Sequence, residues 1–111
     1  MIEFAVDTTA EGIGVVSPRG RLNMASARRL KEVVDELVAG GTTRIVVDMG
    51  ETSFLDSSGL GALIAGLKVA RQAGGDLRIA RPTEAVRTVF GLTNLDRVLK
   101  PRDTVEGAFD A

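Results

Sequence analysis

The chain contains no cysteine and no histidine. Without cysteine it can form neither a disulfide bond nor a thiol nucleophile, and without both residues it cannot build a Cys/His zinc site. The absence of histidine also excludes a Ser-His-Asp triad. Most classes of enzyme that a small domain can host are therefore excluded before any motif is considered.

Long apolar runs are missing as well. The longest, LGALIAGL at residues 60–67, has eight residues, includes two glycines and is followed by Lys68. A membrane-spanning helix needs about twenty apolar residues. The chain begins with the acidic, alternating stretch MIEFAVD, which has neither the basic region nor the apolar run of a secretory signal. We expect a soluble cytoplasmic protein that has no membrane partner.

The sequence also lacks an excess of charge of one sign, because 14 Lys and Arg face 15 Asp and Glu for a net charge of −1. Arg78, Arg81 and Arg87 are scattered and have no interleaved aromatic residues, so no nucleic-acid partner is expected. The 111 residues fit one domain, with 44% hydrophobic residues to build its core. We treat residues 1–111 as a single domain.

Hydrophobic periodicity predicts the strands. Apolar and polar residues alternate over residues 2–6, and a second β-rich run at residues 13–18 completes a hairpin. Residues 44–49, RIVVDM, form a β-branched run without alternation, which is typical of a central strand covered on both faces. Shorter strands are expected at residues 77–80 and 97–99.

Helical spacing predicts four helices. The first runs from Ala27 to Val38, with Asn23 or Ser26 as its cap and Gly40-Gly41 as its stop. The second starts at about Ser57 and stops at Gly74-Gly75. A third follows Pro82-Thr83 and carries Val86, Val89 and Phe90. The stretch Asp103-Thr104-Val105-Glu106 resembles a capping box and predicts a last helical turn that docks Val105 and Phe109.

The alternation of strands and helices in the middle of the chain indicates right-handed crossovers and parallel central strands. The hairpin at the front adds an antiparallel pair. The expected fold is therefore α/β, with a mixed sheet of about four to five strands flanked by four helices.

The most informative stretch is FLDSSGLG at residues 54–61. Structurally, Asp and Ser at the start of a helix satisfy its free N–H groups, and the glycines permit close packing. Functionally, a helix N-terminus attracts an anion, so a serine there could carry a phosphoryl group without disturbing the helix. Such a site suits a reversible interaction switch. Either Ser57 or Ser58 could be the cap or the acceptor.

Other chemistries fit this stretch poorly. It is not G-x-S-x-G, and no G-K-[ST] of a phosphate-binding loop occurs in the chain. Asp48 ends the central strand, but a receiver-type phosphoacceptor needs further carboxylates to hold Mg²⁺, and only Asp7 ends the first strand. Asp48 is interpreted as a polar group that terminates its strand.

The motif Asp56-Ser57-Ser58-Gly59-Leu60-Gly61 resembles the phosphorylation site of bacterial anti-sigma factor antagonists, which are small STAS-domain proteins. The resemblance extends over nearly the whole chain. Three further stretches carry it: Gly20-Arg21-Leu22-Asn23 is similar to the family's G-x-L-D segment, Ile45–Met49 to its central strand, and Leu92–Asp96 to the stretch after its third helix.

The resemblance implies a protein-binding switch that is not an enzyme and holds no cofactor or metal. The unphosphorylated protein would bind a cognate anti-sigma factor, a GHKL-type serine kinase, and so release the sigma factor. The kinase would phosphorylate Ser57, with Ser58 as the alternative acceptor, and a PP2C-type phosphatase would reverse this. The expected partner-binding residues are Asn23, Asp56, Ser57, Ser58, Gly59, Leu60 and Gly61.

One position departs from the family pattern, because many antagonists have Asp where this chain has Asn23. Asn is an equally good helix cap, so the change bears on partner identity more than on the fold. The chain has no obvious dimer seam and is expected to be a monomer or a weak dimer.

Two alternatives remain from the sequence alone. One is a STAS adaptor in another assembly, such as a lipid-transport ABC system, in which Ser57 would only cap the helix. The other is a nucleotide-binding or nucleotide-hydrolysing protein, although no phosphate-cradling loop is visible.

Overall fold

Five strands form a mixed sheet in the computed structural model, which describes residues 3–109. The strands are β1 (Glu3–Thr8), β2 (Gly14–Leu22), β3 (Arg44–Asp48), β4 (Thr52–Leu55) and β5 (Asp76–Ala80). β1 pairs antiparallel with β2, whereas β3 lies between β2 and β5 and is parallel to both. β4 runs parallel to the far end of β2. The predicted mixed sheet with parallel central strands is confirmed.

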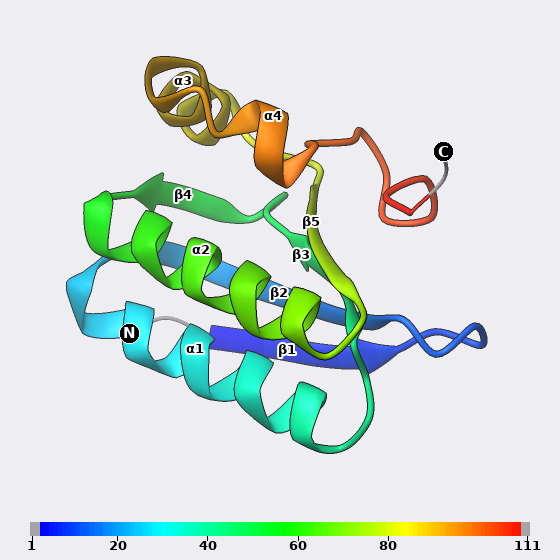
Figure 1. Ribbon diagram of the computed structural model, residues 1–111. Helices are drawn as coiled ribbons and strands as arrows, with labels where there is room; N and C mark the ends of the chain where they lie inside the picture. Colours follow the sequence, from blue (N-terminus) through cyan, green and yellow to red (C-terminus); the bar gives the residue numbers. More distant parts are fainter. Residues whose placement is uncertain (1–2, 110–111) are drawn as a thin grey trace.

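Two long helices, α1 (Met24–Ala39) and α2 (Ser57–Gln72), lie side by side on one face of the sheet (Figure 1). Their apolar sides meet the inward side chains of the central strands. Completely buried members of this core include Leu22, Leu30, Ile45, Leu63, Leu77 and Ile79. Among the described residues, none of the helices has the length and apolar composition needed to cross a bilayer.

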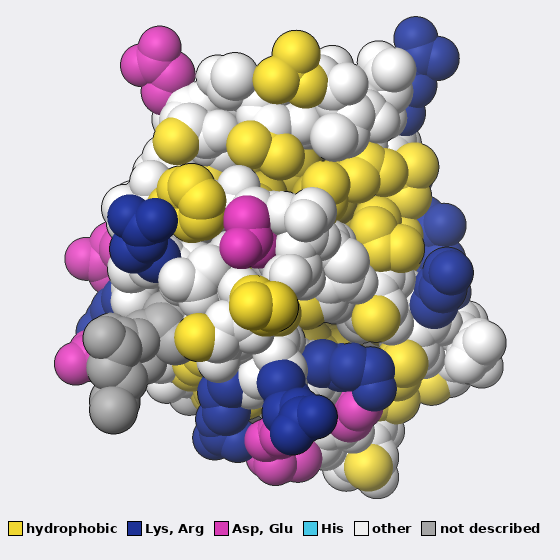
Figure 2. All heavy atoms as spheres, turned by 90° about the vertical axis from the view of Figure 1, so that its left-hand side faces the viewer, with side chains coloured by type: hydrophobic (Ala, Val, Ile, Leu, Met, Phe, Trp, Pro, Cys, Tyr) yellow, Lys and Arg dark blue, Asp and Glu magenta, His cyan; other side chains and the backbone are white. Residues whose placement is uncertain are grey.

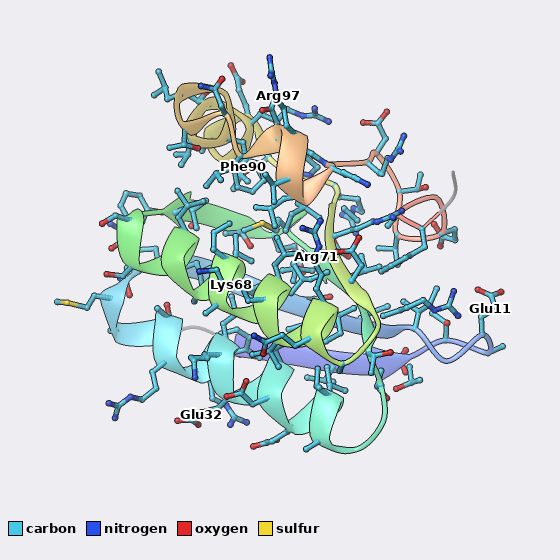
Figure 3. All side chains as sticks on the ribbon, viewed as in Figure 1. Glu11, Glu32, Lys68, Arg71, Phe90 and Arg97 are labelled. Atoms are coloured by element: carbon cyan, nitrogen blue, oxygen red, sulfur yellow. The ribbon has the colours of Figure 1, made fainter. Side chains whose placement is uncertain are left out.

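Two shorter helices, α3 (Glu84–Thr93) and α4 (Asp96–Leu99), lie beyond β4 (Figure 1). Thr83 caps α3, as predicted near Pro82-Thr83, and also donates a hydrogen bond to the carbonyl of Thr52 at 3.0 Å. Phe90 of α3 is almost completely buried in the main core (Figure 3). These contacts attach α3 to β4.

The other face of the sheet is covered in part by the segment after α4. A second, smaller core forms there from Ile13, Val46, Ala80, Val105, Ala108 and Phe109. The predicted docking of Val105 and Phe109 is therefore confirmed.

The first hairpin and β2 extend further than predicted. The chain stays extended through Thr8, where a turn was expected from Asp7, and the expected contribution of Ile2 lies outside the described residues. β2 continues to Leu22 instead of ending at Pro18. In the added part the register shifts between Gly20 and Arg21, because Ser53 of β4 has no partner in β2, and Gly20 has φ +115°.

β2 pairs with two different strands along its length. Residues 14–16 pair with β3, whereas residues 20–22 pair with β4, a strand that the sequence did not predict. As a result Leu22 lies opposite Leu55 at the ends of the two strands. This places the first residues of α1 and α2 next to each other.

Two predicted elements in the last part of the chain are wrong. Residues 97–99, expected as a strand, belong to the one-turn helix α4, which buries Leu99 completely. The chain instead bridges β5 at Arg102. Residues 103–106 lead into turns and not into a helix. Segments of three or four residues contain too little periodicity to be assigned, so tertiary contacts decide their conformation.

Gly59 lies where α2 approaches β2 most closely. A Cβ built at this position would overlap the carbonyl oxygen of Leu22 and lie 2.8 Å from Cδ1 of Leu55. A Cβ at Gly61 would meet nothing within 4 Å. Of these two motif glycines, Gly59 needs the absence of a side chain for packing and Gly61 does not.

This difference predicts opposite effects of the same substitution at the two glycines. We expect Gly59→Ala to lower the free energy of unfolding by about 2 kcal/mol or more, because α2 must move away from β2. Gly61→Ala should be neutral or stabilising by up to about 1 kcal/mol, because alanine is the better helix former. Urea unfolding followed by circular dichroism measures both, and equal midpoints for the two variants would refute the packing argument.

Asp76 connects the C-terminal end of α2 to β5. Its Oδ1 accepts hydrogen bonds from Arg71 Nε and from the Leu77 N–H, both at 3.0 Å, and its Oδ2 accepts one from Arg78 Nε at 3.3 Å. Burial alone would raise the pKa of Asp76. The hydrogen bonds and the charge of Arg71 (Figure 3) outweigh this, so the pKa lies below its ordinary value of 3.8.

A lowered pKa in the folded state predicts a specific pH dependence. The stabilisation from Asp76 is present above the pKa of the unfolded chain and is lost as the pH falls through the lower, folded value. We expect Asp76→Asn to cost roughly 1 kcal/mol at pH 7, and this difference from the wild type to disappear toward pH 2. Thermal unfolding of both proteins between pH 2 and 7 tests this; a difference independent of pH would contradict it.

Candidate functional site at the N-termini of α1 and α2

The two long helices begin immediately after the paired ends of β2 and β4. A single residue, Asn23, separates β2 from α1, and a single residue, Asp56, separates β4 from α2. The N–H of Asp56 donates to the carbonyl of Leu22 at 3.3 Å. The strand pairing therefore fixes the distance between the two helix starts.

Asn23 caps α1 through a complete capping box. Its Oδ1 accepts the N–H of Ala25 at 3.0 Å, and its own N–H donates to Ser26 Oγ at 3.0 Å. Ser26 Oγ also donates to the carbonyl of Arg21 at 2.9 Å. Both residues that the sequence offered as the cap of this helix take part, so the start of α1 is fixed to β2.

Asp56 caps α2 and also reaches α1. Its Oδ1 accepts the N–H of Gly59 at 2.9 Å, and its Oδ2 accepts the N–H of Met24 at 3.2 Å. The carboxylate therefore bridges the first turns of two helices whose positive dipole ends point the same way. A negative group at this place offsets the repulsion between the two dipole ends.

The two serines of the motif are not the cap. Ser57 is the first residue of α2 and is exposed, whereas Ser58 is half-buried. Within residues 3–109, neither serine hydroxyl forms a hydrogen bond with another side chain or with the backbone. Ser57 therefore presents an accessible hydroxyl at a helix N-terminus, in a field that favours a negative group.

The remaining motif residues divide between packing and surface. Gly59 is buried against β2, Leu60 is half-buried at the edge of the main core, and Gly61 is exposed with open space around it. Two of the expected partner-binding positions, Ser57 and Gly61, thus lie at the surface. Gly59 can act on a partner only by allowing α2 to sit close to the sheet.

The structure adds three residues to this face that the sequence analysis did not single out as site residues. Arg21 of β2 lies opposite Phe54 of β4, and its guanidinium carbon is 4.3 Å from the centre of the phenyl ring. Met24, the first residue of α1, is 78% exposed and Phe54 is 36% exposed. Figure 2 shows hydrophobic side chains exposed on the face where the helices begin. The sequence analysis missed the Arg21–Phe54 pairing because it ended β2 at Pro18 and did not predict β4.

Asp48 has the structural role that the sequence favoured. Its Oδ1 accepts the N–H of Gly50 at 3.0 Å, and its Oδ2 pairs with Arg81 at 3.2 Å. In the part of the chain that the structure describes, no three carboxylates come together in a way that could hold a metal ion.

Comparisons with known proteins agree with this geometry. The STAS domain family model matches residues 5–108. A Thermotoga maritima protein assigned as an anti-sigma factor antagonist is 32% identical over 101 residues, which cover 90% of this chain and 89% of the relative. A crystal structure of such a T. maritima protein has a TM-score of 0.88 at 30% identity, over 96% of this chain and 92% of that chain.

Two further relatives are similar over most of their length. The anti-sigma-B factor antagonist of Staphylococcus aureus is 27% identical over 99 residues, covering 89% of this chain and 92% of its own. SpoIIAA of Bacillus shares the fold at 22% identity over 97% of this chain, with TM-scores of 0.83 unphosphorylated and 0.75 phosphorylated, over 94% and 97% of those chains. The family match spans nearly every described residue, and the chain belongs to the STAS domain family.

Proposed function

We propose that this chain is a cytoplasmic anti-sigma factor antagonist whose binding is switched by phosphorylation of Ser57. The unphosphorylated form binds an anti-sigma factor that is a GHKL-type serine kinase, and thereby frees the sigma factor. The kinase then transfers a phosphoryl group to Ser57 and the pair separates. A PP2C-type phosphatase restores the binding form. The chain itself is a phosphoryl acceptor and not an enzyme.

The proposed binding surface is the face around the two helix starts. Its expected contact residues are Asn23, Asp56, Ser57, Ser58, Gly59, Leu60 and Gly61. Ser57 and Gly61 are exposed, and the open space at Gly61 leaves room for a partner's backbone. Buried Gly59 contributes by holding the helix in place.

One observation carries this proposal. The cap of α2 is Asp56, so the hydroxyl of Ser57 is not needed to stabilise the start of the helix. Esterification of that oxygen removes no capping bond. Ser58 follows as the alternative acceptor, but its half-buried position makes it less accessible to a kinase.

The charge of the phosphoryl group changes the affinity for the partner and leaves the fold unchanged. A phosphoserine adds about −1.5 to −2 charges, which the N-termini of α1 and α2 tolerate. At about 5 Å and an effective dielectric near 20, one such charge interacts with a partner charge by about 3 kcal/mol. The two solved forms of SpoIIAA, which share this fold, support the view that the fold persists in both states.

The adaptor alternative has a partner that is bound permanently and a Ser57 that only caps α2, and the same observation is inconsistent with the second part. Capping by Asp56 leaves that alternative without a role for Ser57.

We expect phosphorylation at a single site. Each GHKL-type serine kinase encoded by the host is purified and incubated with this protein and ATP, and tryptic peptides are examined by mass spectrometry. One kinase should add one phosphoryl group to Ser57, and Ser57→Ala should abolish it while Ser58→Ala should not. Phosphorylation of the Ser57→Ala variant at Ser58 would move the switch by one residue, and no modification by any kinase would refute it.

Charge at position 57 should decide whether the partner binds. With the kinase identified above, we expect Ser57→Asp to weaken binding at least tenfold, since about 1.4 kcal/mol of repulsion is enough. Ser57→Ala should bind within about twofold of the wild type. Ser57→Asn has the size of Asp without its charge and should also bind. Calorimetric titration measures all three, and Ser57→Asp with wild-type affinity would exclude the switch.

A further inference from the structure

An arginine held on an aromatic ring lies beside the phosphorylatable face. Arg21 and Phe54 are cross-strand partners one residue before Leu22 and Leu55, the last residues of their strands. The guanidinium carbon lies 4.3 Å from the ring centre. This is a cation–π contact, which restricts the long arginine side chain to the surface of the ring.

The guanidinium of Arg21 has no carboxylate partner among residues 3–109. Several other arginines of the chain do form such pairs, namely Arg19, Arg29, Arg71, Arg78, Arg81 and Arg87. Arg21 is also exposed. Its five N–H donors are thus oriented by the ring yet free to bind an acceptor from outside.

The face that carries Arg21 keeps a net positive charge, because the two helix N-termini add to it. The neighbouring position 23 is occupied by the neutral Asn23. The nearby carboxylate of Asp56 already accepts two backbone N–H groups. The dipole ends of α1 and α2 add further positive potential. A complementary partner surface must therefore be acidic at this place.

The exposed apolar groups next to this charge complete the surface. Met24 is 78% exposed and Phe54 is 36% exposed. Methionine, aromatic residues and arginine are the types enriched where protein partners meet. This surface adjoins the start of α2, where Ser57 lies, because the carboxylate of Asp56 at that start accepts the N–H of Met24.

We infer that the Arg21–Phe54 pair binds a carboxylate on the anti-sigma factor and selects which anti-sigma factor this chain accepts. The inference rests on the proposed function and names the chemistry of that partner. The planar guanidinium donates two parallel N–H hydrogen bonds to the carboxylate oxygens, while Phe54 and Met24 pack against apolar groups beside it. An anti-sigma factor with a lysine or arginine at this point is rejected by like charge.

The test measures the affinity of variants for the kinase that phosphorylates Ser57. Arg21→Glu should weaken binding at least tenfold, and Arg21→Gln, which keeps the length without the charge, roughly fivefold. Phe54→Leu keeps an apolar side chain without a ring face and should weaken binding about two- to fivefold. Lys68→Glu makes the same charge change on α2 (Figure 3), eleven residues after Ser57 and therefore roughly 16 Å from it along the helix axis, and should stay within twofold.

The outcomes distinguish a failure of this inference from a failure of the proposed function. If the wild type binds the kinase and Arg21→Glu and Arg21→Gln bind equally well, the role of Arg21 is refuted and the switch stands. If Arg21→Glu and Lys68→Glu weaken binding alike, only net charge matters and the inference fails. If the wild type binds no kinase, the proposed function and this inference fail together. Circular dichroism and thermal unfolding confirm that each variant is folded before its affinity is compared.

Discussion

The face at which α1 and α2 begin depends on the carboxylate of Asp56. Its two oxygens accept the N–H of Gly59 in α2 and the N–H of Met24 in α1. Two helices that start side by side bring two positive dipole ends together, and their unpaired N–H groups need acceptors. One charged side chain meets both needs. The relative position of the two helix starts is therefore set by a hydrogen-bonded anion as well as by the packing of apolar side chains.

In this arrangement the hydroxyl of Ser57 is not needed to cap α2. In many helices a serine at the start would itself accept the N–H of a later residue, and modifying it would cost a cap. Here Asp56 takes that role, and the packing of Gly59 against the carbonyl of Leu22 holds the first turn of α2 against β2. The rigidity of the helix start and the accessibility of the hydroxyl come from different residues. A reversible chemical change at Ser57 is therefore compatible with an unchanged fold.

The sequence predicts the elements that have strong periodicity. The helix through Leu30 and Val34 and the β-branched strand through Ile45 and Val47 were predicted because their patterns extend over many residues. β4 was missed because TSFL has only four residues and little alternation. Residues 97–99 were assigned wrongly because a helical turn and a short strand look alike at that length.

The candidate site was predicted in part for a related reason. The motif of residues 56–61 is contiguous, so its position at a helix start follows from local chemistry. Asp56 also accepts the N–H of Met24, 32 residues earlier in the chain, and the local chemistry of the motif does not predict this contact. The Arg21–Phe54 contact depends on the pairing of β2 with β4 and on the register shift that follows Gly20. Neither long-range contact has a pattern in the local sequence.

The charges at this face explain how a small modification can act without a conformational change. Arg21 and Asp56 cancel in formal charge, while each helix N-terminus contributes about half a positive charge. A phosphoryl group of about −2 therefore turns a face of roughly one positive charge into one of roughly one negative charge. Because salt screens charges over about 8 Å, this reversal is felt by whatever lies directly against the face and little elsewhere. In the proposed cycle the partner binds through its acidic groups, so the negative phosphoryl group repels that same partner. The rest of the domain only needs to hold Arg21, Asp56 and Ser57 in place.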